Sequence, residues 1–536
     1  MKLLFSVAFT LLLLGVADAQ NTSGLGTISG GFQSDIQLYR NDKKINANAP
    51  DEKIATNNYL KLDYSYKTFE AGIRYEAYLP ALLGYPEELS GTGIVNRYAS
   101  YQNDVLKVTA GNYYTQFGSG LVLRAYEERS LGIDNSLDGI KVEISPIAGV
   151  DLTGVYGTQR EFFNKSDGIV RGLDGNFFVN DIFQIENIPN IQLGASAVSR
   201  FQQYTGPDGY KENIQAYSFR MGITTDKIDL SSEYIEKDVD PTIANNYNNL
   251  RKGRSLLVNA GYSLKGFGVN VTMRRLENMD FRSEREAENN SLWVNYLPAE
   301  TRQHGYALSN IYPYGAQSLG EVGGQMSLTY NIKKKSALGG KYGTNIYLNY
   351  SHFKSLKNNV NPALSLEDFN TNLFEAGDST YYEDFSIEIK RKINRKWILT
   401  GSYIQQEYNK NQIEGVPVEN VKAKIGVLES FIKLPNRRSL RTEIQHLWTK
   451  QDNQNWFAFL AEYNVAPYWS FFLLDQYNYG ADKQPNYYQV GYAYSKSATR
   501  ISMSYGRQRG GIICVGGVCR FVPAASGLTA SITTSF

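Results

Sequence analysis

Apolar and polar residues alternate along most of this chain, and the alternation predicts antiparallel β-strands. In residues 59–66 the even positions are leucine or tyrosine, whereas residues 69–77 place their apolar side chains at odd positions. Because successive side chains of a strand face opposite sides, each segment has one apolar and one charged face. The charged faces of these two segments and of residues 385–390 carry Lys61, Asp63, Glu70, Arg74, Glu76, Glu388 and Lys390.

The same period recurs to the end of the chain. It is clear in residues 256–264, 267–273, 346–350, 488–494 and 501–505. We count about 24 candidate strands and accept a range of roughly 20 to 26, since bacterial single-chain barrels have an even number. A one-sided sheet of a secreted β-sandwich or solenoid has the same period, so alternation alone leaves that class open.

The lengths of the links between strands favour a membrane barrel. Outer-membrane barrels have short periplasmic turns and long extracellular loops. Here short links at 67–68, 103–104, 265–266, 394 and 497–498 alternate with long polar links at 41–56, 80–93, 238–253, 277–320, 355–378 and 508–523. We therefore predict an all-β fold, a single large closed antiparallel transmembrane β-barrel over residues 20–536 with long extracellular loops.

The two ends of the sequence predict export to the outer membrane. Lys2, an apolar run over residues 3–16 and Ala17-Asp18-Ala19 fit a signal peptide spanning residues 1–19. The last strand alternates up to Phe536, and an aromatic C-terminal residue resembles the sorting signature that the barrel-assembly machinery reads. If Phe536 lies in the periplasm, the link 508–523 and the other long links are extracellular.

Composition agrees with a barrel embedded in outer-membrane lipid. The chain has 40 tyrosines, 25 phenylalanines and 5 tryptophans, and amphipathic aromatic side chains form the girdles of a barrel at the two membrane interfaces. Its 55 basic and 53 acidic residues give a net charge of +2. A balance of this kind gives no reason to expect a nucleic-acid partner.

Residues 117–139 form the first candidate site. This glycine-flanked segment carries both signs of charge, a composition suited to folding inward and constricting a wide lumen. An ordinary strand and loop with solvated ion pairs is the alternative. The candidate constriction residues are Arg124, Glu127, Glu128, Arg129, Asp134 and Asp138.

Two long links form the other candidate sites. The link 277–320 is rich in charged and aromatic residues, so it could cap the barrel or dock an envelope protein; the alternative is a folded surface loop that shields the pore. In the link 508–523, Cys514 and Cys519 flank Gly516-Gly517. Two cysteines in an exported protein predict a disulfide, and the glycines allow the tight turn that it needs. Two thiols without a nearby histidine are an incomplete metal site.

Catalytic signals are weak. His304 and His446 are candidate general bases of an outer-membrane hydrolase, and His352 falls on the lipid-facing parity. The sequence contains neither a G-x-S-x-G nor an H-E-x-x-H motif. We therefore predict no enzymatic activity and no cofactor.

Several motifs of this chain resemble an uncharacterised family of outer-membrane proteins from Bacteroidetes-type bacteria. The most specific is the glycine- and cysteine-rich segment 510–523, and four others lie elsewhere in the mature chain. The resemblance implies a barrel in that envelope and assigns no activity. The other motifs are residues 129–135, 169–175, 296–299 with His304, and 312–314.

These patterns lead to one main functional hypothesis and two alternatives. A charged inward face predicts a porin-like channel for polar solutes. The first alternative is a non-conducting barrel subunit of an envelope assembly or secretion complex that docks a partner through 277–320 and 508–523. The second is the hydrolase. Energy-coupled transport is less favoured because alternation begins by about Leu25, with no separate plug domain before it.

Overall fold

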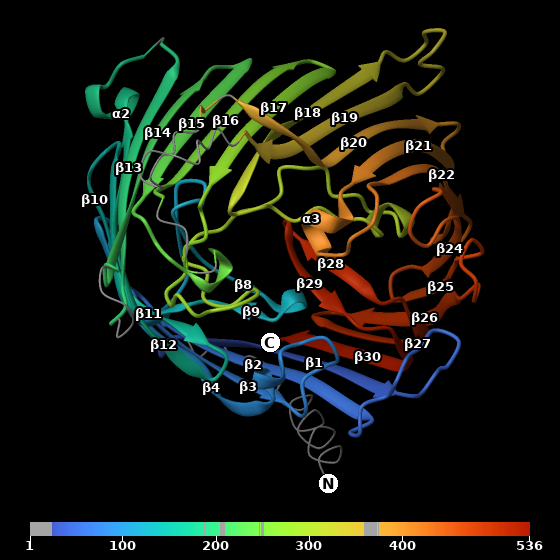
Figure 1. The fold of residues 1–536 in the computed structure, drawn as a ribbon, viewed down its shortest axis with the longest axis horizontal. Coiled ribbons are helices and arrows are strands. Elements are labelled where there is room, and N and C mark those ends of the chain that lie inside the picture. Colours follow the sequence, from blue (N-terminus) through green and yellow to red (C-terminus); the bar gives the residue numbers. More distant parts are fainter. Residues whose placement is uncertain are drawn as a thin grey trace.

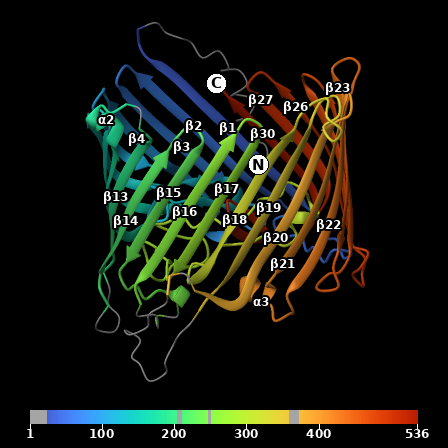
Figure 2. The ribbon, with the colours of Figure 1, turned by 90° about the horizontal axis from the view of Figure 1, so that it is seen from above.

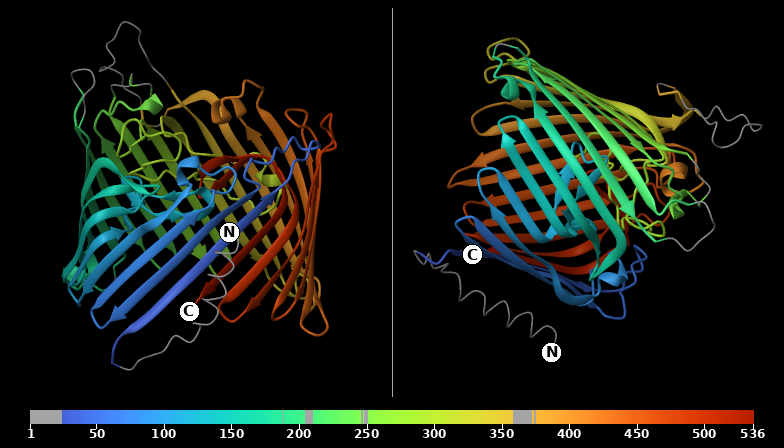
Figure 3. Two further views of the ribbon diagram at one scale, coloured as in Figure 1. Left: turned by 90° about the horizontal axis from the view of Figure 1, so that it is seen from below. Right: turned by 90° about the vertical axis from the view of Figure 1, so that its left-hand side faces the viewer.

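The computed structural model describes residues 24–186, 188–203, 210–245, 247, 251–357, 372–373 and 375–536. The predicted signal peptide, residues 1–19, lies outside them. One sheet of 24 antiparallel strands closes on itself where β1 pairs with β30. Figures 1 and 2 show the resulting barrel along and across its axis, and Figure 3 shows its tilted strands from two further sides. The predicted fold class and strand number are confirmed.

The barrel strands follow one another in chain order. They are β1 (Thr27–Tyr39), β2 (Ile54–Tyr66), β3 (Phe69–Tyr78), β4 (Gly91–Gln102), β5 (Leu106–Tyr113), β10 (Leu137–Ile147), β11 (Val150–Glu161), β12 (Asn164–Phe178), β13 (Asn190–Phe201), β14 (Asn213–Thr224), β15 (Ile228–Lys237), β16 (Gly253–Leu264), β17 (Phe267–Glu277), β18 (Gly320–Ile332), β19 (Thr344–Leu356), β20 (Ala376–Lys392), β21 (Trp397–Tyr408), β22 (Val421–Leu434), β23 (Arg438–Trp448), β24 (Trp456–Val465), β25 (Trp469–Tyr477), β26 (Asn486–Lys496), β27 (Thr499–Gln508) and β30 (Ala525–Ser535).

Shorter elements lie in the links. The short strands are β6 (Thr115–Phe117), β7 (Leu123–Ala125), β8 (Glu127–Glu128), β9 (Ile133–Asp134), β28 (Gly511–Val515) and β29 (Val518–Val522). The helices are α2 (Val179–Phe183) and α3 (Lys410–Glu414), with 3-10 turns η1 (Glu87–Leu89), η2 (Arg129–Leu131), η3 (Ile243–Asn245) and η4 (Leu308–Asn310). In the described part of the chain, no helix is long and apolar enough to cross a membrane.

Strand pairing places the apolar side chains on the outside of the barrel. Leu62 lies opposite Ile73 and Tyr64 opposite Ala71, so neighbouring strands share one apolar face. Large side chains on this face are exposed, for example Leu173 at 68% and Phe219 at 63%. An exposed band of apolar residues around a closed barrel is the surface that lipid requires.

The links separate by length between the two ends of the barrel. We call the end with links 40–53, 79–90, 114–136, 238–252, 278–319 and 509–524 the loop end, and the opposite end the turn end. The turn end holds the links 67–68, 103–105, 265–266 and 497–498. It also holds Phe536, whose backbone exchanges two hydrogen bonds with Gly30 of β1. Three links break the predicted pattern, since 162–163 is short at the loop end while 179–189 and 333–343 are longer at the turn end.

Candidate functional site

Three links of the loop end fold into the barrel. They are 114–136 with β6 to β9, 278–319 with η4, and 509–524 with the β28–β29 hairpin. Figure 1 looks along the barrel and draws β8, β9, β28 and β29 inside the ring of strands. We call these three segments together the plug.

Two apolar cores attach the plug to the barrel wall. In the first, Phe117, Val122 and Leu123 meet Phe281 and Val294 against inward-facing residues of β10 to β17. The wall residues of this core are Leu137, Val155, Val170, Val198, Ile214, Ala216, Ile235, Leu257 and Leu276. Burial of so many aliphatic side chains is favourable by about 1.5–3 kcal/mol each relative to exposure. The segments therefore form a packed interior on this side of the lumen.

The second core fixes the other half of the long link. Leu308, Ile311, Tyr312 and Tyr314 pack against β19 to β24, and Tyr314 stacks on Phe353 and Tyr382 with ring centroids 5.3 and 5.1 Å away. The same link therefore contacts both sides of the barrel. The wall residues of the second core are Phe353, Tyr381, Tyr382, Ile404, Tyr408, Val421, Ala423, Ile425, Val427, Leu447, Trp456 and Ala458.

The three plug segments also bind one another. The backbone N–H of Arg124 donates to the Val294 carbonyl at 2.8 Å, and that of Tyr296 donates to the Gly120 carbonyl at 2.9 Å. The Tyr296 hydroxyl donates to the Gly516 carbonyl at 2.8 Å. The Arg124 guanidinium lies 4.0 Å from the Tyr296 ring centroid, a cation–π contact. Each segment thus depends on the others for part of its hydrogen bonding.

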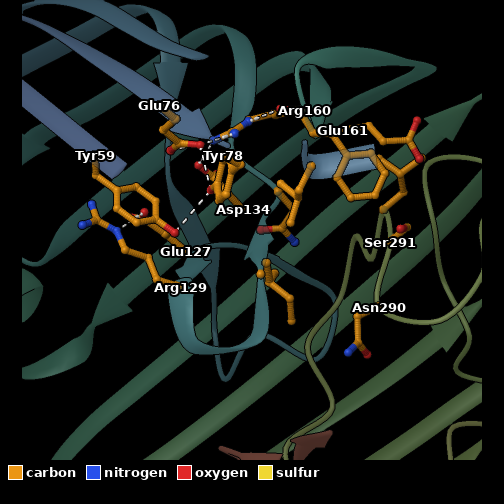
Figure 4. Close-up of a pocket in the computed structure, with 16 residues that line it drawn as sticks. Tyr59, Glu76, Tyr78, Glu127, Arg129, Asp134, Arg160, Glu161, Asn290 and Ser291 are labelled. Atoms are coloured by element: carbon orange, nitrogen blue, oxygen red, sulfur yellow. Dashed lines mark hydrogen bonds and ion pairs between the residues drawn. The ribbon is translucent and has the colours of Figure 1, made fainter. Parts of the chain in front are cut away.

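A network of six charged residues with a buried centre joins segment 114–136 to the wall. We call it the latch, and Figure 4 shows five of its members. Arg160 of β11 lies 2.6 Å from both Glu76 and Asp134, and Arg74 of β3 contacts the same two carboxylates. Three arginines face three carboxylates, so the latch is neutral overall. Its members are Arg74, Glu76, Glu127, Arg129, Asp134 and Arg160.

The electrostatics of the latch favour the ionised form of Asp134. Arg74 and Glu76 are 3% and 1% exposed, so neither charge is solvated. Burial opposes ionisation of Asp134, but the Arg160 and Arg74 guanidinia hold its pKa below the usual value. The carboxylates of Glu76, Glu127 and Asp134 lie within 4.8 Å of one another, a spacing that would suit a metal ion. Because each is already paired with arginine, we assign no metal to them.

A second charged pair anchors the long link. Arg274 of β17 and Glu321 of β18 are fully buried and 2.6 Å apart. Arg274 also donates to the Pro298 carbonyl, and Glu321 accepts from the Tyr314 hydroxyl at 2.6 Å. We call the Arg274–Glu321 pair the second anchor, because it binds two separate parts of the plug.

A family model described as "Family of unknown function (DUF6029)" matches residues 1–536. The chain belongs to this family. No curated protein matches the sequence.

Three solved structures with similar folds are distant in sequence. The P pilus usher (PapC) translocation pore is 10% identical with a TM-score of 0.43, covering 95% of this chain and 99% of the usher. The siderophore receptor PirA from Pseudomonas aeruginosa is 9% identical with a TM-score of 0.40, covering 95% and 80%. Pseudomonas aeruginosa OpdK, solved with vanillate, is 9% identical with a TM-score of 0.37, covering 95% and 98%. For this DUF6029 member, the barrel is established by the strand pairing itself.

The structure brings together residues from two predicted groups. Arg74 and Glu76 of the predicted lumen lining meet Glu127, Arg129 and Asp134 of the predicted constriction in the latch. The pairs that Arg74 makes with Glu76 and Asp134 are buried, whereas the Arg129–Glu127 pair is partly exposed. The structure adds Arg160 to this network. Simple alternation in β11 would place Arg160 on the outward face with Tyr156 and Thr158. A register shift between Thr158 and Arg160 turns it inward.

The other predicted constriction residues lie apart from the latch. Arg124 stacks within the plug, and Glu128 accepts hydrogen bonds from the backbone and hydroxyl of Ser130. The prediction that Asp138 lines the constriction is corrected by the structure. Leu137 belongs to the inner core, and because neighbouring side chains of a strand alternate, Asp138 faces outward. There Asp138 pairs with Lys165 at 2.6 Å, and both residues lie on the outer surface of the barrel near its loop end.

The remaining predicted lining residues face inward nearer the turn end. Lys61 pairs with Asp63 at 3.0 Å, and Glu388 pairs with Arg302 of the plug at 2.8 Å. Glu70 and Lys390 share the inward face of their strands with Asp63 and Glu388. The charged part of the lumen therefore lies between the apolar cores of the plug and the turn end.

Two of the three histidines are on the outer wall. His352 shares its face with Tyr350, and His446 lies opposite the exposed Phe457. His304 lies inside, where its ring bonds Asp384 at 2.8 Å and its carbonyl accepts from Asn310. Asp384 also accepts from Tyr382 and Gln406. These contacts attach the plug to β20 and account for His304 structurally.

The predicted disulfide is confirmed. Cys514 and Cys519 lie opposite each other in the β28–β29 hairpin and are bonded. Gly516 and Gly517 make the turn with φ of +57° and +79°. Arg520 of this hairpin donates to the carbonyls of Ser130 and Gly84 and so ties it to two other links.

We expect loss of the disulfide to loosen the hairpin and leave the barrel intact. Closing so short a loop contributes about 2 kcal/mol in the chain-entropy model. The Cys514→Ser/Cys519→Ser protein should show faster tryptic cleavage after Arg520 while keeping the heat-modifiable gel mobility of a folded barrel. Unchanged cleavage would contradict this role of the disulfide.

Plug docking should strengthen at mildly acidic pH. Burial raises the pKa of Glu300 above its ordinary 4.5, although Arg274 opposes the shift. A carboxyl with a raised pKa binds more protons in the docked state, so docking is strongest below the ordinary value and weakens as pH rises through the raised one. Limited proteolysis of the link 278–319, compared at each pH with cleavage of the denatured chain, should slow on acidification in the wild type and vary less in Glu300→Gln. Equal pH profiles of the two proteins would refute the role of Glu300 in plug docking.

Proposed function

We propose that this protein is an outer-membrane channel for polar solutes whose lumen is narrowed by the plug. The observation that carries the proposal is the charged inward face toward the turn end. There Arg441 lies 2.9 Å from Glu429 and 2.8 Å from Glu462, in addition to the Lys61–Asp63 pair. Ionised side chains inside a closed barrel with an apolar exterior fit a water-filled lumen in a membrane.

The plug is consistent with a channel of this width. Barrel diameter grows with strand number, porins of roughly 16–18 strands already leave an aqueous channel, and still wider barrels are plugged. A barrel of 24 strands without internal structure would admit large molecules unselectively. Inward-folded loops reduce the open cross-section and provide the side chains that select solutes.

Planar-bilayer recording tests the channel. The purified wild type should give small conductance steps, and a variant with residues 283–318 replaced by a short glycine-serine link should give much larger ones. Gel mobility before and after heating reports whether each barrel is folded. Absence of conductance in both folded proteins would refute the channel.

The two apolar cores support a second candidate, a non-conducting subunit of an envelope assembly or secretion complex. They join the plug to opposite walls, as a permanently closed barrel would require. In this case residues 277–320 and 508–523 would present their outer surfaces to an envelope protein. Purification from the native envelope should then yield a stoichiometric partner that is lost when 277–320 is shortened, and both the wild type and the shortened protein would be tested for conductance.

A further inference from the structure

One arc of the turn end carries a dense group of basic residues. Three links contribute to it: 333–343 between β18 and β19, 393–396 between β20 and β21, and 435–437 between β22 and β23. These six strands are consecutive neighbours in the wall (Figure 2). With the adjoining strand ends, the links hold twelve lysines and arginines and no acidic residue. The twelve are Lys333, Lys334, Lys335, Lys341, Lys390, Arg391, Lys392, Arg395, Lys396, Lys433, Arg437 and Arg438. Of the three consecutive cations of β20, Arg391 falls on the outward face, whereas Lys390 and Lys392 fall on the inward face at the mouth of the lumen. We call this group the basic arc.

The basic arc has no internal counter-charge. All twelve side chains are exposed, and none takes part in an ion pair in the described part of the chain. Lys341 and Lys392 instead lie 5.7 and 5.2 Å from the ring centroid of Tyr342. Each of the other turn-end links holds at most one basic residue, and link 225–227 also holds Asp226 beside its Lys227. The densest positive charge of the turn end is therefore on one side of the barrel.

The arc borders the lipid-facing band. Arg391 lies opposite Leu399, and Arg438 lies opposite Leu434 in the strand register, so both cations are on the outward face. Trp397, on the same face, is 36% exposed, and Leu338 in the first link is 72% exposed. Basic side chains next to tryptophan and leucine at the edge of an apolar band extend their charges to the level of lipid phosphates.

We propose that the basic arc binds the anionic headgroups of phospholipids, such as phosphatidylglycerol or cardiolipin, in the leaflet at the turn end. The inference rests on the proposed membrane location. Each Lys or Arg near an anionic membrane surface contributes about 1 kcal/mol. An acidic soluble protein would also fit the charge, but the apolar residues that share the outward face with Arg391 and Arg438, such as Trp397 and Leu434, favour lipid. Binding would hold this side of the barrel against one leaflet and enrich anionic lipid around it.

Native mass spectrometry of the full chain, released from detergent with equal amounts of phosphatidylglycerol and phosphatidylethanolamine, tests the proposal. The wild type should retain phosphatidylglycerol preferentially. The Lys334→Gln/Arg391→Gln/Arg438→Gln variant should bind it roughly 100-fold more weakly, as expected for three lost contacts. The matched control, Lys67→Gln/Lys227→Gln/Lys496→Gln, removes three exposed cations, two from the links 67–68 and 225–227 and one from the end of β26, all at the turn end and away from the arc. It should bind like the wild type.

Three results would overturn the proposal: equal retention of the two lipids by the wild type, equal loss in both triple variants, or displacement of the lipid by millimolar inorganic phosphate, which would indicate a free-anion site. Conductance of the same preparations in neutral bilayers is a separate readout. A barrel that conducts without lipid preference contradicts only the lipid site. A barrel that prefers phosphatidylglycerol without conducting contradicts only the channel.

Discussion

Replacement of Arg160 by alanine is expected to release segment 114–136 from the barrel wall and, in the proposed channel, to raise single-channel conductance. Arg160 is 5% exposed and pairs with both Glu76 and Asp134. Without it, the latch has three carboxylates for two arginines in a buried site. Removing one partner of a buried ion pair costs about 3–5 kcal/mol, so the ratio of docked to undocked plug should fall by a factor on the order of 100 or more.

Two measurements report this change. Planar-bilayer recording should find larger or longer openings in Arg160→Ala, and trypsin should cleave faster after Arg124 and Arg129, which lie in the released segment. The control is Lys252→Gln, which removes an exposed pair with Glu236 at the loop end and should change neither readout. The double variant Arg160→Ala/Glu76→Gln restores charge balance and should recover part of the wild-type behaviour. If Arg160→Ala behaves like the control, the latch does not hold the plug.

The barrel wall could be predicted from the sequence because lipid imposes a simple rule on it. Every second residue of a spanning strand must be apolar, and the register then follows from the turns. The turns at 67–68 and 265–266 lie where the alternation changes parity, and β2 pairs with β3 without a shift. The disulfide was also predictable, since the chain has two cysteines and the glycines between them permit a tight turn.

The plug was harder to predict because loop residues obey no such rule. Segment 278–319 contacts both sides of the barrel through residues whose partners are far apart in the chain. One signal does exist in the wall. Toward the loop end, inward positions such as Val170, Val198 and Ile214 are apolar where an aqueous lumen favours polar residues. Strands that are apolar on both faces therefore indicate internal packing.

The latch shows why charge composition alone could not give the site. The sequence placed Arg74 and Asp134 in different groups, and only the folded segment 114–136 brings them together. A bulge turns Arg160 inward, against the simple alternation of β11. Asp138 failed as a lumen residue for the opposite reason, because it already belongs to β10 and follows the parity of that strand. One residue more or less in a strand decides which side of the wall a charge reaches.

Replacement of Arg274 by methionine is expected to free the long link from the wall. The loss of docking free energy should be comparable to that of Arg160→Ala. Methionine keeps much of the volume but leaves the fully buried Glu321 without a cation. Tyr314 and the backbone N–H of Gln317 would still donate to Glu321, but an uncompensated buried carboxylate costs about 3–5 kcal/mol. Trypsin should then cleave after Arg302, which lies in this link, far faster than in the wild type.

A double-variant cycle separates the charge of Arg274 from its packing. Arg274→Met/Glu321→Gln removes both charges, so cleavage after Arg302 should return toward the wild-type rate even though the Pro298 carbonyl has lost its donor. If the double variant stays as sensitive as Arg274→Met, packing rather than charge balance holds the link. Because plug segments share backbone hydrogen bonds such as that from Arg124 to Val294, Arg274→Met combined with Arg160→Ala should raise conductance by a non-additive factor. Strict additivity would mean that the two segments move independently and that the plug has two separate parts.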